Sequence, residues 1–121
     1  MRSNKPHFDF VELHILHHAS EGSLYGLWMI EELAEHGYLL SASQLYPKFH
    51  RLERNGYLAR NEKIVDGKLR KYYRITREGR KHLREREGQL KELITETLTS
   101  NEIAEALRKR QRREEEKRQP V

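Results

Sequence analysis

Apolar residues in the first half of the chain recur every three or four positions in three successive segments, a spacing typical of amphipathic helices. The segments cover residues 8–19, residues 25–36 and the stretch after Leu40. A polar loop at Ser20–Ser23 separates the first two, and Gly37 follows the second, where helices commonly end. The apolar positions that we expect to face the core are Phe8, Val11, Ile15, Leu16, Ala19, Leu27, Ile30, Leu33, Ala34, Leu45, Phe49 and Leu52. The pattern predicts three short helices.

The start of the third helix has two candidate N-caps, Ser41 and Ser43. Ser41 has Gln44 at the spacing of a capping box. Proline fits the first turn of a helix and clashes further in, so Pro47 favours the later cap. We therefore expect the helix to begin after Ser43 and to end at Asn55-Gly56.

After Gly56 the periodicity changes to that of strands. The segments 57–65 and 69–75 are rich in aromatic and β-branched residues, and Asp66-Gly67 lies between them. Asp-Gly is a strong signal for a tight hairpin turn. Three helices followed by a basic hairpin is the layout of a winged helix-turn-helix. We expect a mainly α fold with a small β-hairpin.

A long amphipathic helix follows the hairpin, from about Arg77 into the high 90s, with Thr76 as its predicted N-cap. Either the domain's own core or a second subunit must cover the apolar stripe of such a helix. The length of the stripe favours a second subunit, so we predict a homodimer. The predicted dimerisation residues are Leu83, Leu90, Leu93, Ile94 and Leu98.

The sequence divides into three predicted regions. We expect residues 1–76 to form the winged helix-turn-helix domain, residues 77–107 the dimerisation helix region and residues 108–121 a charged tail. A break and a new cap are predicted at Ser100–Glu102. We expect the tail to be solvated or to form a frayed helix.

Composition narrows the choice of partner. The 121 residues carry a net charge of +5, and 36% of them are charged. This balance favours a polyanionic partner such as nucleic acid, although ordinary solubility charge also explains it. The lack of cysteine excludes disulfides and thiolate metal sites. No stretch has the apolar length of a signal peptide or membrane span, so we expect a cytoplasmic protein with no membrane contact.

The third helix and the hairpin together suggest a DNA-reading surface. Polar and basic side chains of the helix fall away from the core side, as a helix in the major groove requires. Positive charge also gathers on and beside the hairpin turn. Either feature alone also fits an ordinary solvated surface. The predicted DNA-binding residues are Ser43, Gln44, Tyr46, Pro47, Lys48, Arg51, Arg54, Lys68, Arg70 and Lys71, with Gln44 and Arg51 as the expected base contacts.

Two long motifs resemble the PadR family. Residues 45–58 read Leu-Tyr-Pro-Lys-Phe-His-Arg-Leu-Glu-Arg-Asn-Gly-Tyr-Leu, similar to the family's recognition-helix signature. Residues 67–80 read Gly-Lys-Leu-Arg-Lys-Tyr-Tyr-Arg-Ile-Thr-Arg-Glu-Gly-Arg, similar to its wing. Tyr25-Gly26 resembles the start of its second helix, where the family usually continues with Tyr and this chain has Leu27. The resemblance covers about Phe10 to Leu98.

The resemblance implies a sequence-specific transcriptional regulator, usually a ligand-responsive repressor, that binds a palindromic operator as a homodimer. It also implies dimerisation through the C-terminal helix, against the partner's first helix, as in the smaller subfamily with one such helix. Small aromatic or apolar effectors are known in the family, and Trp28 is a candidate contact; a lone Trp in a helix is otherwise a core residue. The absence of aromatic residues from Arg77 to Leu98 argues against the ligands that stack on that helix in other members.

Other functions find less support. His14 and His18 lie one turn apart and have the spacing of metal ligands. Without an HExxH motif or a second ligand cluster, we interpret them and His17 as a polar face and predict no metal and no cofactor. No catalytic motif is present, so we expect no enzyme. A winged-helix module that binds proteins and does not read DNA is the alternative, which salt-dependent duplex binding would distinguish.

Overall fold

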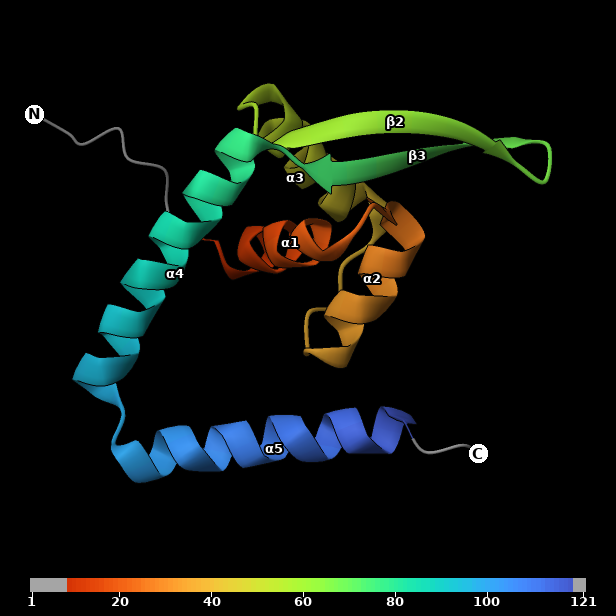
Figure 1. Cartoon of the computed structure of the whole chain (residues 1–121). Coiled ribbons are helices and arrows are strands. Elements are labelled where there is room, and N and C mark those ends of the chain that lie inside the picture. The colour runs from red at the N-terminus through yellow and green to blue at the C-terminus, as the bar shows by residue number, and fades with distance from the viewer. Residues whose placement is uncertain (1–8, 119–121) are drawn as a thin grey trace, which may run out of the picture. The chain divides into compact units, whose positions relative to one another are not determined.

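The structure is a computed structural model that describes residues 9–118. Residues 1–8, which include the predicted core residue Phe8, lie outside the described residues. So do residues 119–121, the end of the predicted tail. The elements in chain order are α1 (Phe10–Glu21), β1 (Leu24–Tyr25), α2 (Gly26–Glu35), α3 (Ala42–Arg54), β2 (Leu58–Val65), β3 (Lys68–Ile75), α4 (Arg77–Thr97) and α5 (Ser100–Arg118) (Figure 1). The predicted fold class, mainly helical with a small hairpin, is confirmed.

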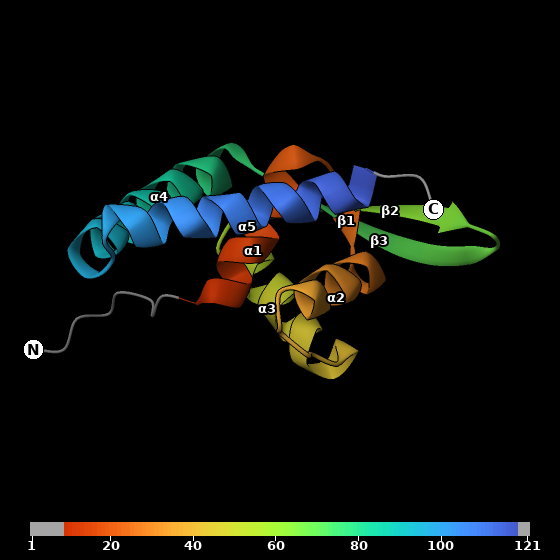
Figure 2. The ribbon, with the colours of Figure 1, turned by 90° about the horizontal axis from the view of Figure 1, so that it is seen from below.

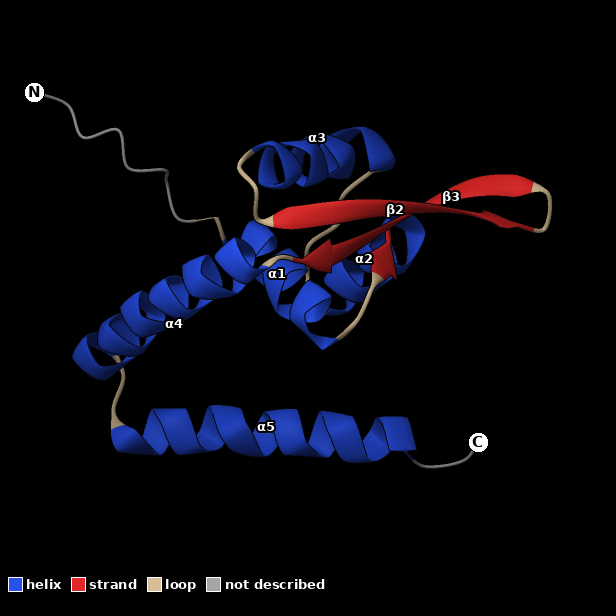
Figure 3. Cartoon of the chain, turned by 45° about the horizontal axis from the view of Figure 1, so that its top comes forward, coloured by secondary structure: helices blue, strands red, loops and turns tan. Residues whose placement is uncertain are grey.

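The chain forms two compact units, the first ending at Arg86 and the second beginning at Glu87. In the first unit, α1, α2 and α3 lie beside one end of the β2–β3 hairpin, while its other end projects from the helices (Figure 3). The second unit contains the rest of α4 and all of α5. Thr99 caps α5, because its hydroxyl accepts from the Glu102 backbone N–H at 3.2 Å. The predicted break is therefore confirmed, one residue earlier than the predicted cap.

A third strand joins the hairpin. β1 pairs antiparallel with β3, so the strand order is β1-β3-β2 (Figure 2). The sequence analysis placed no strand here, because two residues are too few to produce an alternating pattern. This pairing fixes the start of α2 against the wing.

The core of the first unit takes its side chains from all three helices, the sheet and the start of α4. The buried residues are Val11, Ile15, Leu16, Ala19, Leu24, Met29, Leu33, Leu45, Phe49, Leu52, Leu58, Tyr73, Ile75 and Leu83. The prediction for α2 was partly wrong, since Leu27 is 59% exposed and Ala34 is exposed. The buried face of α2 runs through Gly26, Met29 and Leu33, which lie three and four residues apart.

The predicted start of α3 was also wrong, because Ser41 and not Ser43 is the N-cap. The Ser41 backbone N–H donates to the Gln44 side-chain oxygen at 2.9 Å, as in a capping box. Pro47 consequently lies inside the helix. Proline at position 47 has no N–H to donate to the carbonyl of Ser43. Because Ser43 is exposed in the first turn, this carbonyl is open to solvent.

The wing forms as predicted. β2 and β3 pair from Leu58 opposite Ile75 to Val65 opposite Lys68. Asp66 and Gly67 at the turn have φ of 53° and 76°. Positive φ at both central residues is the signature of the turn that suits a twisted two-residue hairpin, and it explains the Asp-Gly pair.

The first turn of α4 is fixed to the loop that precedes the wing. The Thr76 hydroxyl donates to the Gly56 carbonyl at 2.6 Å and accepts from the Gly79 N–H at 2.9 Å, which confirms Thr76 as the cap. A Cβ at Gly79 would lie 2.1 Å from the Tyr57 carbonyl oxygen. Only glycine therefore permits this approach of α4 to the wing.

We predict that Gly79→Ala lowers the free energy of unfolding by roughly 1–3 kcal/mol, because backbone atoms must separate. Gly88→Ala is the matched control: nothing lies within 4 Å of its Cβ position in the same helix. It should stabilise by about 0.5–1 kcal/mol through helix propensity. Urea unfolding measures both, and equal effects of the two variants would refute the close approach at Gly79.

Candidate nucleic-acid interface

The outer face of α3 is polar and accessible, as the sequence predicted. Leu45, Phe49 and Leu52 are buried on the inner face. Tyr46 and Lys48 are half-buried at the flanks. The exposed residues of the helix are Ala42, Ser43, Gln44, Pro47, His50, Arg51 and Arg54.

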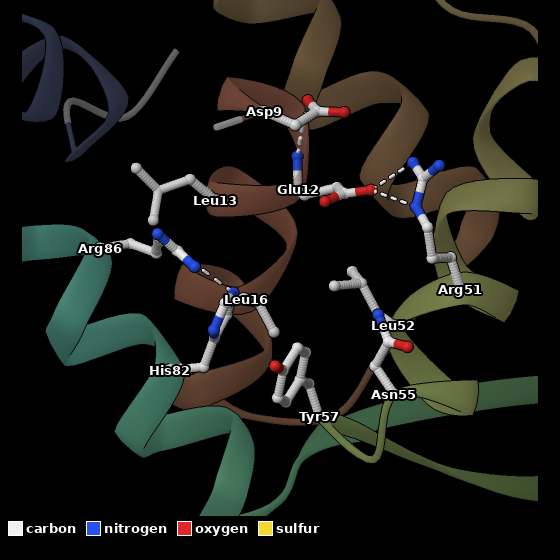
Figure 4. A pocket seen from close by; sticks show the side chains of 10 residues that line it. All are labelled: Asp9, Glu12, Leu13, Leu16, Arg51, Leu52, Asn55, Tyr57, His82 and Arg86. Atoms are coloured by element: carbon white, nitrogen blue, oxygen red, sulfur yellow. Dashed lines mark hydrogen bonds and ion pairs between the residues drawn. The ribbon is translucent and has the colours of Figure 1, made fainter. Parts of the chain in front are cut away.

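Two cations of α3 are held by acidic residues at the start of α1. The Lys48 ammonium donates to Asp9 Oδ2 at 2.7 Å. The Arg51 guanidinium donates two hydrogen bonds to Glu12 Oε1, one of them from Nε at 2.8 Å (Figure 4). No local sequence pattern indicates these pairs, since each joins residues 39 positions apart. Both cations thus lean toward α1, and DNA would have to compete with a carboxylate for either.

Asp9 remains ionised at neutral pH. Burial raises the pKa of its carboxyl, but the Lys48 ammonium and the backbone N–H groups of Glu12 and Val11 outweigh burial and hold the pKa below its ordinary value. The same carboxylate is the N-cap of α1, where the Val11 N–H donates to it at 2.9 Å. One side chain therefore both caps α1 and ties α3 to it.

Gln44 and Arg54 differ in the hydrogen-bond donors that remain available to DNA. The Gln44 side-chain oxygen is engaged by Ser41, whereas its amide nitrogen is the end that remains to donate from the exposed first turn. Arg54 forms no ion pair within residues 9–118, the part of the chain that the structure describes. A full bidentate contact to adenine would require Gln44 to give up its capping bond.

One face of the wing carries most of its positive charge. Lys63 lies directly opposite Arg70, and Lys68 and Arg74 occupy the same face of β3. Like charges directly across a strand pair are destabilising. The Arg70 guanidinium lies 4.3 Å from the ring centre of Tyr25, and the Lys63 ammonium 5.3 Å from that of Tyr72. A surface that keeps such an arrangement is suited to an anionic partner.

Lys71 points from the opposite face of β3, across from Glu62. The alternation of side chains along a strand therefore separates Lys71 from Lys68 and Arg70, which the sequence analysis had grouped. An acidic residue opposite Lys71 partly offsets its charge.

The wing and the two helices of the helix-turn-helix meet around a hollow of about 520 Å³. The hollow brings together four predicted residues, Tyr46, Lys68, Arg70 and Lys71. It also includes Tyr25 and Gly26 at the start of α2, which has no side-chain cap. A Cβ at Gly26 would lie 2.4 Å from the Tyr46 hydroxyl. The Tyr25-Gly26 pair was a sequence signal for this contact, but it was not assigned to the site.

Two further cavities lie in the first unit. One of about 320 Å³ is drawn in Figure 4, where Leu13, Leu16 and Tyr57 line it together with polar side chains that include the His82–Arg86 pair. The other, of about 400 Å³, is lined by Tyr25, Trp28 and Tyr72 among others. Trp28 is 38% exposed and does not belong to the core.

The predicted dimerisation stripe divides between the two units. Leu83 is buried in the core of its own chain. Leu90 and Ile94 are half-buried, while Leu93 and Leu98 are exposed. The exposed and half-buried members of the stripe therefore all lie beyond Leu83.

Comparison with known proteins gives consistent results. Residues 15–85 match the family model of the transcriptional regulator PadR-like family. The chain is 47% identical over 88 residues to the transcriptional regulator Rv3488 of Mycobacterium tuberculosis, covering 73% of this chain and 82% of that protein. The structure of this chain is similar to that of a PadR family transcriptional regulator from Eggerthella lenta. The TM-score is 0.64, the sequences are 35% identical, and the match covers 80% of each chain. The structure of smu.1704 from Streptococcus mutans is also similar, with a TM-score of 0.60 and 32% identity. The match covers 78% of this chain and 86% of smu.1704.

The three-helix core, the wing and the basic surface between them define a winged-helix DNA-binding protein. The chain belongs to the PadR-like family of transcriptional regulators. It is therefore a regulator of transcription that binds DNA, and not an enzyme. Within residues 9–118, no helix is both long and apolar enough to cross a bilayer.

We predict that Glu12→Gln strengthens binding to random duplex DNA, because it releases the Arg51 guanidinium for a phosphate. The slope of log K against log salt should steepen by up to about 0.9. Glu92→Gln makes the same charge change at an exposed position of α4 and is the control. Fluorescence anisotropy at several salt concentrations measures both. Equal effects of the two variants, or weaker binding by Glu12→Gln, would contradict release of Arg51.

Proposed function

We propose that this chain is a sequence-specific repressor that acts in the cytoplasm as a homodimer on a palindromic operator. The observation that carries the proposal is the hollow in which Lys68, Arg70 and Lys71 of the wing meet Tyr46 of α3 and the start of α2. An exposed helix of this kind suits the major groove, and a projecting basic hairpin suits the adjacent backbone or minor groove.

The proposed DNA-binding residues fall into base contacts and phosphate contacts. Ser43, Gln44 and Arg54 present donors from the outer face of α3 and are the proposed base-reading group, with Pro47 and Tyr46 shaping the contact. Lys68 and Arg70 are proposed phosphate contacts, and Lys71 a weaker one because of Glu62. Lys48 and Arg51 are proposed to contact DNA on exchange of Asp9 and Glu12 for phosphate.

The dimer is proposed to form through residues 77–107, while residues 1–76 bind DNA and residues 108–121 form a charged extension. Leu93 of α4 and Leu98, the residue that follows the helix, support this assignment, since each is at least 40% exposed. Leu90 and Ile94 lie beside them, and Leu83 serves its own core. Two copies related by a two-fold axis would place two recognition helices on two half-sites.

An aromatic effector is proposed to bind beside Trp28. The cavity there has three aromatic side chains, and Tyr25 and Tyr72 meet edge to face with ring centres 5.6 Å apart. Because Trp28 is the single tryptophan, tryptophan fluorescence comes from this position alone. Quenching by phenolic acids that is saturable and lost in Tyr72→Ala would support the assignment, and the same quenching in that variant would refute it.

We predict that Lys68→Ala weakens binding to every duplex alike and lowers the salt slope by about one. Lys81→Ala, an exposed position on α4, controls for loss of charge. Binding isotherms against operator and random DNA measure the effect. A loss confined to one base position would contradict a phosphate contact, and weak salt dependence of the wild type would favour the protein-binding alternative.

We predict that Leu93→Glu converts the dimer to monomers with the first unit still folded, because the substitution places a charge in the proposed interface. Leu39→Glu is the control, since Leu39 is 82% exposed and lies outside α4. Sedimentation velocity with circular dichroism measures assembly and folding. A folded Leu93→Glu variant that stays dimeric would exclude this face as the interface.

A further inference from the structure

A cluster of metal-ligand side chains lies between α1 and α2, outside the proposed DNA-binding residues. His14 and His18 are one turn apart on α1, and Glu32 and His36 are one turn apart at the end of α2. Residues four apart share one face of a helix. Two such pairs therefore approach each other from neighbouring helices.

The distances between these groups approach those of a coordination sphere. One ring nitrogen from each of His14, His18 and His36 lies within 4.8 Å of the others. Glu32 Oε1 is 3.5 Å from His18 Nε2 and 3.3 Å from His36 Nε2. Ligand atoms at about 2.0–2.1 Å around a tetrahedral zinc ion are themselves about 3.3 Å apart. The separations of Glu32 from His18 and from His36 are close to this value.

The surroundings of His14 and His18 favour the neutral imidazole, which is the form that binds metal. Burial lowers the pKa of His14, and the neighbouring His36 and His18 lower it further. Burial also lowers the pKa of His18, against the opposing effect of Glu32.

His18 also has the outer partner that metal-binding histidines usually have. Its Nε2 faces Glu32, while its Nδ1 lies 3.6 Å from Glu21 Oε1. A carboxylate on the second ring nitrogen orients the ring and raises its basicity as a ligand. Glu21 would thus position His18 without touching the ion.

We infer that His14, His18, His36 and Glu32 bind one divalent transition-metal ion of the zinc class, joining α1 to α2. Three imidazoles and one carboxylate suit zinc, cobalt or nickel, whereas magnesium and calcium prefer oxygen ligands. The sequence analysis predicted no metal because it found no second ligand cluster. That cluster comes from α2, and only the fold brings it to α1. The inference does not depend on the proposed function.

A second group, His17, His18 and Glu21, has similar spacing but is a weaker candidate. Its three members belong to α1 alone, and His17 and Glu21 have side chains 53% and 63% exposed. Because His18 belongs to both groups, His17 and His36 are the residues that distinguish them.

The direct test is titration of untagged, chelator-treated protein with Co²⁺. Tetrahedral coordination gives intense visible absorption bands, which we expect to saturate at one ion per chain. Trp28 supplies an independent readout, since its ring centre lies 5.3 Å from that of His18. Bound Co²⁺ should quench its fluorescence with the same midpoint.

Matched Gln variants locate the site. His36→Gln and His14→Gln should each weaken Co²⁺ binding by roughly tenfold or more. His17→Gln makes the same chemical change on α1 and should leave the midpoint within error of the wild type. Zn²⁺ should raise the thermal midpoint of the wild type and His17→Gln but not of His36→Gln, because binding only to the folded state stabilises it. Circular dichroism confirms that each variant is folded.

Three results would overturn the inference. Wild-type protein that shows neither absorption bands nor quenching has no such site. Folded His36→Gln that binds as well as the wild type excludes the α2 ligands. A loss in His17→Gln equal to that in His36→Gln assigns the metal to the exposed group on α1.

Discussion

The stacking of Phe49 on Tyr73 is the contact on which the DNA-binding surface depends. Their ring centres are 4.5 Å apart, the planes are 9° from parallel, and neither side chain is exposed. Phe49 belongs to α3 and Tyr73 to β3, so the pair joins the recognition helix to the wing. Because Phe49 is buried, the opposite face of α3 points outward. Because Tyr73 holds the C-terminal end of β3 in the core, the end at Lys68 projects with the turn as the wing.

The charged side chains of this surface differ between the wing and α3. The wing keeps Lys63 opposite Arg70, a pairing that costs stability unless an anion binds. The cations of α3 are treated differently, because Asp9 and Glu12 neutralise Lys48 and Arg51 in the free protein. Exposed cations on the wing, such as Lys63 and Lys68, favour the approach of DNA.

Local patterns were enough to predict the helices, the hairpin and the outer face of α3. Asp66-Gly67 predicted its turn because the turn requires positive φ at neighbouring residues. The start of α3 was missed because a two-way capping bond at Ser41 outweighed the cost of Pro47 inside the helix. The Lys48–Asp9 pair and the approach of His36 to His14 join distant segments, and no local pattern records them. The sequence therefore predicted which face of α3 is exposed, but not which of its side chains are paired.

The central claim is that α3 and the wing of a dimer read a defined DNA sequence. Selection of fragments from genomic DNA by the purified wild-type protein tests it most directly. The account predicts enrichment of an inverted repeat whose half-sites are about one helical turn apart, since two recognition helices enter successive major grooves. Recovery of fragments with no common sequence, or of a motif without two-fold symmetry, would contradict it.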